Sequence, residues 1–137
     1  MLKAIIEALH DEIRWPDAAE RALLKEPYQG LFRDVVGIMD ATEWFIVKYG
    51  DSVRERDTFS GKAQTNTKKT LAVIDRYGYF HFISKLIDGK HNDREQYTMS
   101  DLYMSAGRYF SEGEKLASDG GYSGDGNLVI SFDLLDD

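Results

Sequence analysis

The chain has 137 residues, of which 42% are hydrophobic and 30% charged, a composition typical of a globular domain rather than a disordered chain. A domain of this length buries about two thirds of the surface of its unfolded chain, which is enough for one hydrophobic core. The absence of cysteine excludes disulfide scaffolds, thiolate metal sites and cysteine nucleophiles, and the net charge of −7 argues against binding nucleic acid through overall charge.

Two short helices are expected before the first strand. Apolar residues recur at helical spacing over residues 2–13, and Trp15-Pro16 ends this pattern. Because acidic residues interrupt it, this segment is neither a signal peptide nor a membrane span. Asp17, followed three residues later by Glu20, predicts a capping box at the start of a second helix, which Pro27 ends.

The middle of the chain has the pattern of three strands. Residues 35–49 favour a strand, but their number exceeds the usual five or six, so we expect a bend near Asp40-Ala41-Thr42. Residues 67–75 and 79–87 both alternate between apolar and polar positions, as the two faces of a sheet require. Asp75-Arg76-Tyr77-Gly78 between them is typical of a type I turn, so the two segments are predicted to form a β-hairpin.

The second half of the chain mixes helix and strand signals. Asn92 or Asp93 can cap a helix that runs to about Tyr103. Its inner stripe is expected to consist of Met99, Leu102, Tyr103 and Ala106. Residues 115–118 are short and ambiguous, and residues 128–132 favour one more strand. The element order predicts a mixed α/β layer fold around an antiparallel hairpin.

Three acidic residues, Asp40, Asp93 and Asp119, each come after an apolar segment. In α/β folds the ends of strands bring distant positions together and form ligand sites. Two carboxylates that meet there can hold Mg²⁺, which completes its shell with water and phosphate oxygens. They can equally be turn residues, and Asp93 can be a helix N-cap, so the pattern alone leaves these alternatives open.

A basic segment stands out against the acidic chain. Residues 54–69 hold five basic and two acidic side chains, a local charge of +3. Such a segment can contact a phosphate backbone, and it can also be an ordinary solvated loop.

Several motifs of this chain resemble those of the DDE transposases of the PIF/Harbinger kind. They are D-V-V-G-I-M-D-A-T-E-W, F-S-G-K-A-Q-T-N-T-K-K-T-L-A-V-I-D-R-Y-G, D-G-K-H-N-D-R-E-Q-Y and L-A-S-D-G-G-Y-S-G, in that family's order and approximate spacing. The similarity extends from Trp15 to Gly124. It implies an α/β, RNase H-like mixed sheet, with N-terminal helices over residues 1–30 and the nuclease domain over residues 31–137. It also implies Mg²⁺ or Mn²⁺ in a two-metal site, and DNA as the partner.

Matching this sequence to the family's motifs position by position gives candidate site residues. Asp40 and Asp119 match the first and second catalytic acids and are the implied metal ligands. Asp93 and His91 lie where the family has a loop between them, as supporting or substrate-side residues. The candidate contacts to the DNA backbone are Lys62, Lys68 and Lys69.

The chain also departs from the family pattern. Ala41 replaces a glycine, Glu43 stands near a usual histidine, and Asn92 precedes the loop acid where a histidine is common. The family's third acid, a glutamate on a later helix, is not found, so a partial domain truncated at its C-terminus is expected. Two functions therefore stay open: a metal-dependent endonuclease or strand-transfer core, and a non-catalytic, transposase-derived interaction module. A separate DNA-binding partner protein is also possible. The N-terminal segment leads us to expect no membrane association and no secretion, and the location is expected to be nuclear in a eukaryote or cytoplasmic otherwise.

Overall fold

The computed structural model describes residues 12–48, 50–122 and 127–130. The helix predicted over residues 2–13 therefore lies almost entirely outside the described residues, as do positions 131–132 of the last predicted strand. The strands are β1 Val35–Phe45, β2 Phe59–Ser60, β3 Thr65–Ile74, β4 Phe80–Ile83, β5 Ile87–Asp88, β6 Lys115–Ser118 and β7 Leu128–Ile130. The helices are α2 Ala18–Lys25, α3 Ser52–Thr58, α4 Asp93–Thr98, α5 Asp101–Met104 and α6 Ala106–Tyr109, with 3₁₀ turns η1 Gly30–Phe32 and η2 Gly120–Tyr122.

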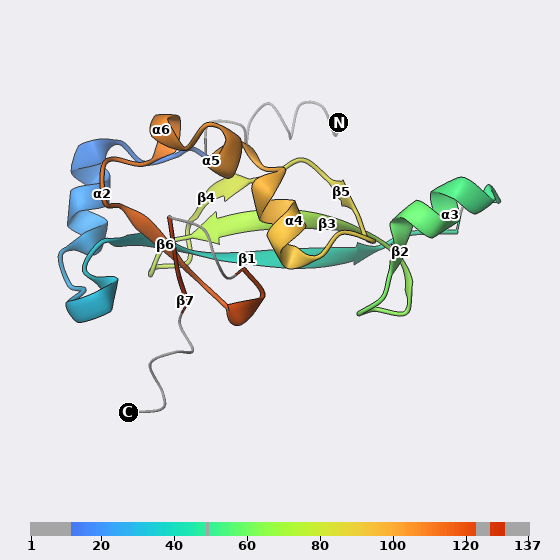
Figure 1. Ribbon diagram of the computed structural model, residues 1–137. Coiled ribbons are helices and arrows are strands. Elements are labelled where there is room, and N and C mark those ends of the chain that lie inside the picture. The colour runs from blue at the N-terminus through green and yellow to red at the C-terminus, as the bar shows by residue number, and fades with distance from the viewer. Residues whose placement is uncertain (1–11, 49, 123–126, 131–137) are drawn as a thin grey trace.

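Strand β1 is at the centre of one mixed sheet (Figure 1). On one side it pairs antiparallel with β3, and on the other it pairs parallel with β6, which pairs parallel with β7. The short strands β2, β4 and β5 all pair antiparallel with β3. The predicted fold class, an α/β mixed sheet of the RNase H-like kind, is confirmed, and the ambiguous residues 115–118 are a strand.

The bend expected near Asp40 is absent, and this prediction was wrong. Strand β1 is continuous over 11 residues, because its pairing with β3 runs without a shift from Ile38 opposite Ile74 to Phe45 opposite Thr67. Asp40 is thus inside a long strand rather than at its end. The irregularity lies earlier, on the β6 side, where the register shifts between Val35 and Gly37.

The β-hairpin is confirmed, and Asp75 organises its turn. The Gly78 amide donates to the Asp75 carbonyl at 3.0 Å. The Asp75 carboxylate accepts the amides of Tyr77 at 2.8 Å and Tyr79 at 3.1 Å. Gly78 has φ +88°, a conformation that other residues rarely adopt. An acid at the first position and a glycine at the fourth therefore fix the connection between β3 and β4.

Helix α2 begins with the predicted capping box. The Asp17 carboxylate accepts the Glu20 amide at 2.9 Å, and the Glu20 carboxylate accepts the Asp17 amide at 2.8 Å. The helix then contributes Arg21, whose Nε donates to Glu114 at 2.7 Å just before β6, with both side chains buried. Lys25 donates to the other oxygen of the same carboxylate at 2.8 Å. These ion pairs attach the N-terminal helix to the parallel side of the sheet.

The helix predicted to run to about Tyr103 is divided into two short helices, α4 and α5, so that prediction was wrong. Asn92 is the N-cap of α4, and it forms a capping box with Glu95. The helix ends at Thr98. The Ser100 hydroxyl donates to the Tyr97 carbonyl at 2.6 Å, and this side-chain bond favours a turn over a continued helix. Met99 and Tyr103 of the expected stripe are 50% and 44% exposed, whereas Leu102 is fully buried.

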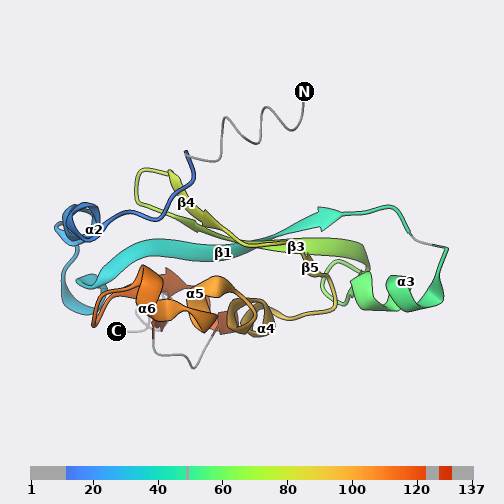
Figure 2. The ribbon, with the colours of Figure 1, turned by 90° about the horizontal axis from the view of Figure 1, so that it is seen from above.

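Helices α4, α5 and α6 cover one face of the sheet (Figure 2). Between them and the sheet is the core, in which side chains of β1, β3 and β6 meet aromatic and aliphatic side chains of the helices. Its buried members are Val36, Met39, Leu71, Val73, Tyr97, Leu102, Phe110, Leu116 and Tyr122. On the other face of β1, Ile38 and Trp44 are 43% and 55% exposed.

Replacing Gly89 with alanine is expected to lower the free energy of unfolding by about 1–3 kcal/mol. A Cβ at this position would lie 2.5 Å from the Thr58 carbonyl oxygen and 2.8 Å from that of Thr67, and backbone atoms cannot move aside cheaply. Gly107→Ala in α6 is the matched control, because nothing lies within 4 Å of its Cβ position. Urea unfolding of both variants measures the difference. Equal stability of the two would contradict this steric account.

Candidate functional site

Parallel pairing of β1 with β6 brings Asp40 and Asp119 together. Ile38 is opposite Ala117 in the last pair of this ladder, and Asp40 and Asp119 each follow that pair by two residues. Neighbouring strands lie about 4.8 Å apart. Both acids are exposed, and both line one pocket of about 410 Å³ at this part of the sheet. Asp40 lies within β1, whereas Asp119 directly follows the last residue of β6.

The third acid, Asp93, lies near Asp119 beside Gly121. A Cβ on Gly121 would lie 2.8 Å from Asp93 Oδ2 and 3.1 Å from Asp119 Oδ1, so the two oxygens are no farther apart than these distances combined. Asp93 is the first residue of α4, but Asn92 serves as the N-cap of this helix. The Asp93 carboxylate is therefore not used for capping, and the glycine leaves room for the two acids.

Tyr122 places a phenol next to this group of acids. Its side chain is completely buried. Burial raises the pKa of the phenol above its ordinary value, and the charges of Asp93, Asp40 and Asp119, in that order, raise it further. The Ala41 amide acts in the opposite direction and lowers the pKa of the phenol. The hydrogen bond that this amide donates goes to the Asp40 carboxylate, at 2.7 Å. The Tyr122 hydroxyl has no hydrogen-bond partner among the described residues.

Two other buried polar atoms near these acids have no partner within the described part of the chain. They are Ser118 Oγ, in the residue before Asp119, and Gln96 Oε1, one turn along α4 from Asp93. Buried polar atoms are nearly always hydrogen-bonded in folded proteins. All three exceptions lie within three residues of Asp93 or Asp119 in the sequence.

The acids fit a hydrated divalent ion better than a fully enclosed one. Within the described ranges, no group of three or more His, Asp or Glu side chains is arranged to hold a metal ion. Mg²⁺ needs no such group, since it binds through one or two carboxylates and keeps several waters or phosphate oxygens. Asp40 and Asp119, exposed at one pocket, meet that requirement.

Lys69, proposed from the sequence as a contact to DNA, is instead a buried residue. It is only 5% exposed, and its ammonium donates to the His91 carbonyl at 2.8 Å and lies 3.5 Å from Glu43. The alternation of β3 accounts for this, because Lys69 shares the core face with Leu71 and cannot also reach a duplex outside.

Glu43 and the backbone carbonyl of His91 both contact the Lys69 ammonium. Burial raises the pKa of Glu43, but hydrogen bonds from Ser60 and Thr67 and the Lys69 ammonium outweigh it, so the pKa lies below its ordinary value. The His91 ring lies 3.3 Å from Glu95. The structure thus places His91 beside α4, where its backbone carbonyl supports Lys69.

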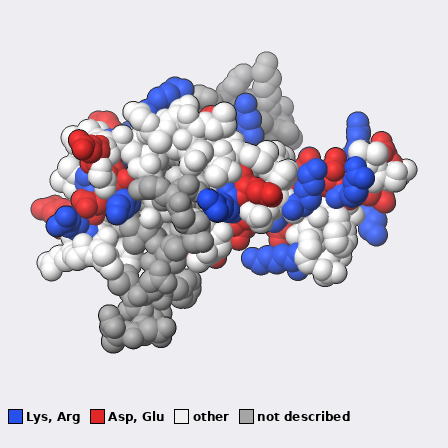
Figure 3. Space-filling view, in the orientation of Figure 1, with Lys and Arg blue, Asp and Glu red and all other residues white. Residues whose placement is uncertain are grey.

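The other basic residues belong to an arm built from the end of β1, α3, β2 and the start of β3. The basic segment is therefore a helix and paired strands rather than a loop. Lys62 is exposed in the turn before β3, and Lys68 is paired with Asp88. Blue side chains gather over this arm, with acidic ones among them (Figure 3). The exposed basic side chains of the arm are Lys48, Arg54, Arg56 and Lys62.

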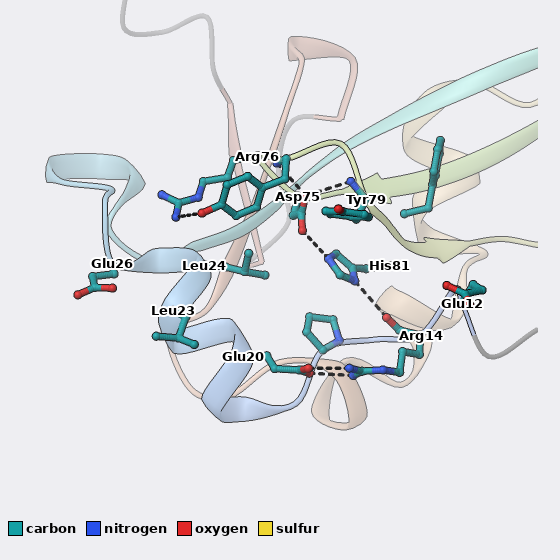
Figure 4. Close-up of a pocket in the computed structure, with 13 residues that line it drawn as sticks. Glu12, Arg14, Glu20, Leu23, Leu24, Glu26, Asp75, Arg76, Tyr79 and His81 are labelled. Atoms are coloured by element: carbon teal, nitrogen blue, oxygen red, sulfur yellow. Dashed lines mark hydrogen bonds and ion pairs between the residues drawn. The ribbon is translucent and has the colours of Figure 1, made fainter.

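A second pocket, of about 700 Å³, lies between α2 and the β3–β4 turn (Figure 4). Four of its charged or titratable groups form two pairs. Arg14 bonds Glu20 at 2.6 Å, and His81 Nε2 lies 2.9 Å from Asp75 Oδ2. The Asp75 carboxylate also holds the hairpin turn. These groups have structural roles, so the pocket with Asp40 and Asp119 is the better candidate.

The family model described as DDE superfamily endonuclease matches residues 39–134. This range covers more than half of the chain and includes all three acids. The chain belongs to the DDE superfamily endonucleases. The predicted membership is confirmed. No curated protein and no solved structure matches the chain significantly. None of the described helices of this family member is long and apolar enough to span a membrane.

Tyr122 and Gly121 were not recognised as site residues from the sequence, where the glycine pair suggested a tight turn and the tyrosine a core or rim aromatic. Both interpretations are correct, since η2 is a tight turn and the Tyr122 side chain is in the core. What the sequence could not show is that α4 packs on this turn and brings Asp93 to it.

Proposed function

We propose that this chain is a divalent-metal-dependent endonuclease core that acts on DNA phosphodiesters, with Asp40 and Asp119 as metal ligands. Family membership supports the reaction class. The observation that supports the assignment is that both acids line one pocket, each two residues beyond the last pair of the β1–β6 ladder. Mg²⁺ or Mn²⁺ is the proposed ion, because carboxylate oxygens suit these ions.

The bound ion would activate the attacking water or hydroxyl and stabilise the leaving oxygen of the phosphodiester. The residues of the chain have separate tasks. Asp40 holds its carboxylate toward the Ala41 amide, which donates to it at 2.7 Å, and Asp119 accepts the Gly121 amide at 3.0 Å. These contacts leave oxygen lone pairs of both carboxylates to bind a cation. Two strands and a tight turn fix the spacing of the acids before any ligand arrives.

The arm beyond the site is the proposed contact for the DNA backbone. Its exposed Lys48, Arg56 and Lys62 can neutralise phosphates although the whole chain carries a charge of −7. Lys69 has no part in this contact because it is buried. A separate DNA-binding partner protein would add affinity that this acidic chain lacks.

The direct test incubates the protein with supercoiled plasmid DNA and Mg²⁺ or Mn²⁺, and follows nicked and linear forms on gels. Cleavage that requires the metal and stops on addition of EDTA is expected. In parallel, Mn²⁺ titrated by calorimetry should bind the wild-type protein and raise its melting temperature. Absence of both cleavage and metal binding would favour the alternative, a non-catalytic transposase-derived interaction module.

Replacing Gly121 with alanine is expected to weaken Mn²⁺ binding while changing the free energy of unfolding by less than about 1 kcal/mol. The new methyl group would displace the carboxylate oxygens of Asp93 and Asp119, and side-chain ends can move at little cost. Gly120→Ala, with nothing within 4 Å of its Cβ position, is the matched control. Equal Mn²⁺ affinity of the two variants would argue against Asp119 as a metal ligand.

A further inference from the structure

The hydroxyl of Tyr122 is the most unusual polar atom of the described structure. Its side chain is 0% exposed, and the oxygen has no hydrogen-bond partner among the described residues. A buried hydroxyl without a partner destabilises a fold, because it has lost its water and gained nothing in return. A phenylalanine would fill the same space without this cost, so packing alone does not account for the hydroxyl.

The surroundings of this hydroxyl indicate what it can bind. Three carboxylates, those of Asp93, Asp40 and Asp119, act electrostatically on the phenol, with Asp93 having the largest effect of the three. The Asp93 carboxylate lies against Gly121, the residue next to Tyr122, and α4 packs on the η2 turn that contains both. A protonated phenol is a donor, and a carboxylate is an acceptor.

The three negative charges repel one another in the absence of a cation. A divalent ion bound by Asp40 and Asp119 would reduce that repulsion and allow the Asp93 carboxylate to turn toward the phenol. A hydrogen bond from the phenol to Asp93 would then form only in the metal-bound state. Such outer contacts orient the acidic groups around a metal ion and raise its affinity.

We propose that Tyr122 is a positioning residue of the acidic site, whose hydroxyl donates to the Asp93 carboxylate when a divalent ion is bound at Asp40 and Asp119. This inference rests on the proposed function. It assigns Asp93 to the outer shell of the ion, as a third acid supplied from α4. It also accounts for the unpartnered hydroxyl, which serves the metal-bound state rather than the metal-free fold.

Tyr122→Phe tests this proposal because it removes the oxygen and keeps the ring. Mn²⁺ affinity is measured by calorimetry, and the melting temperature is measured with and without Mn²⁺. The variant is expected to bind Mn²⁺ roughly 10-fold more weakly and to melt, without metal, at the same temperature as the wild type or higher. Tyr109→Phe is the matched control, since its ring packs against Trp15 and Phe82, away from the acids. It should keep the wild-type Mn²⁺ affinity.

Two results would overturn the positioning role while the proposed function stands. One is wild-type Mn²⁺ affinity in Tyr122→Phe alongside lost binding in Asp40→Asn. The other is a lower melting temperature of Tyr122→Phe without metal, which would mean that the hydroxyl already has a structural partner. If the wild-type protein itself binds no Mn²⁺, the proposed function is overturned, and this inference with it. That result differs from the two above, in which the wild type binds the ion.

Discussion

Replacing Glu114 with glutamine is expected to lower the free energy of unfolding by about 3–5 kcal/mol. The Glu114 side chain is 3% exposed, and its two oxygens accept from Arg21 at 2.7 Å and Lys25 at 2.8 Å. It also accepts the Ser111 amide at 2.8 Å. The neutral amide would leave the buried Arg21 guanidinium without its counter-charge, which costs far more than the loss of an exposed ion pair. Urea unfolding at neutral pH measures the change.

The control is Arg33→Gln, which removes an ion pair whose side chains are 75% and 44% exposed. It should change stability by less than about 1 kcal/mol, because exposed pairs are well solvated. Comparable losses in the two variants would refute the buried-pair argument.

The Glu114 ion pairs also predict how stability depends on pH. Burial raises the pKa of Glu114, but its bonds to Lys25, the Ser111 amide and Arg21 outweigh burial, so the pKa is lowered below its ordinary value. A carboxyl with a lowered folded pKa stabilises the protein above its unfolded pKa, and this stability is lost as the pH falls through the folded value. The wild-type protein should therefore lose stability in acid more steeply than Glu114→Gln, which has no such group to protonate.

Replacing Asp40 or Asp119 with asparagine is expected to lower metal-dependent nicking of plasmid DNA at least about 100-fold, since even outer contacts of a metal site are worth 10- to 100-fold. An asparagine keeps the size of the side chain and loses the charge that binds the cation. Glu112→Gln, an exposed acid outside the site, should leave nicking unchanged. Equal nicking by all these variants would exclude the acids from the reaction.

The same asparagine variants should be at least as stable as the wild type without metal. Asp40 and Asp119 line one pocket, where two negative charges repel one another. Removing one charge relieves this repulsion, so loss of activity cannot come from unfolding. Thermal melting in EDTA provides the measurement, and a lower melting temperature of Asp40→Asn would show that the acid has a structural role instead.

Features that depend on neighbouring residues could be predicted from the sequence. The capping box of Asp17 and Glu20 and the turn from Asp75 to Gly78 were both confirmed. In each case residues three positions apart bond to one another, so the local pattern contains the whole interaction. The family resemblance supplied the candidate acids, because the order of motifs along the chain can be compared without knowledge of long-range contacts.

Local patterns were misleading where tertiary contacts outweighed them. The length of β1 argued for a bend at Asp40, but unbroken pairing with β3 keeps the strand continuous through it. The helical pattern after Asn92 continued past Thr98, but turns at Ser100 and Ser105 divide it. Lys69 looked like a surface cation within a basic segment, yet its strand position gave it a buried partner, Glu43.

The sequence by itself determined the composition of this domain, its caps and turns, and the acids available for chemistry. Only the tertiary structure decided which acids meet. Asp40 and Asp119 are far apart in the chain, and parallel pairing of β1 with β6 brings both to the lining of one pocket. Packing of α4 on η2 then adds Asp93 and surrounds the Tyr122 hydroxyl with charge. Parallel strands are joined by long connections, so the residue pattern within one strand does not indicate which strand pairs with it.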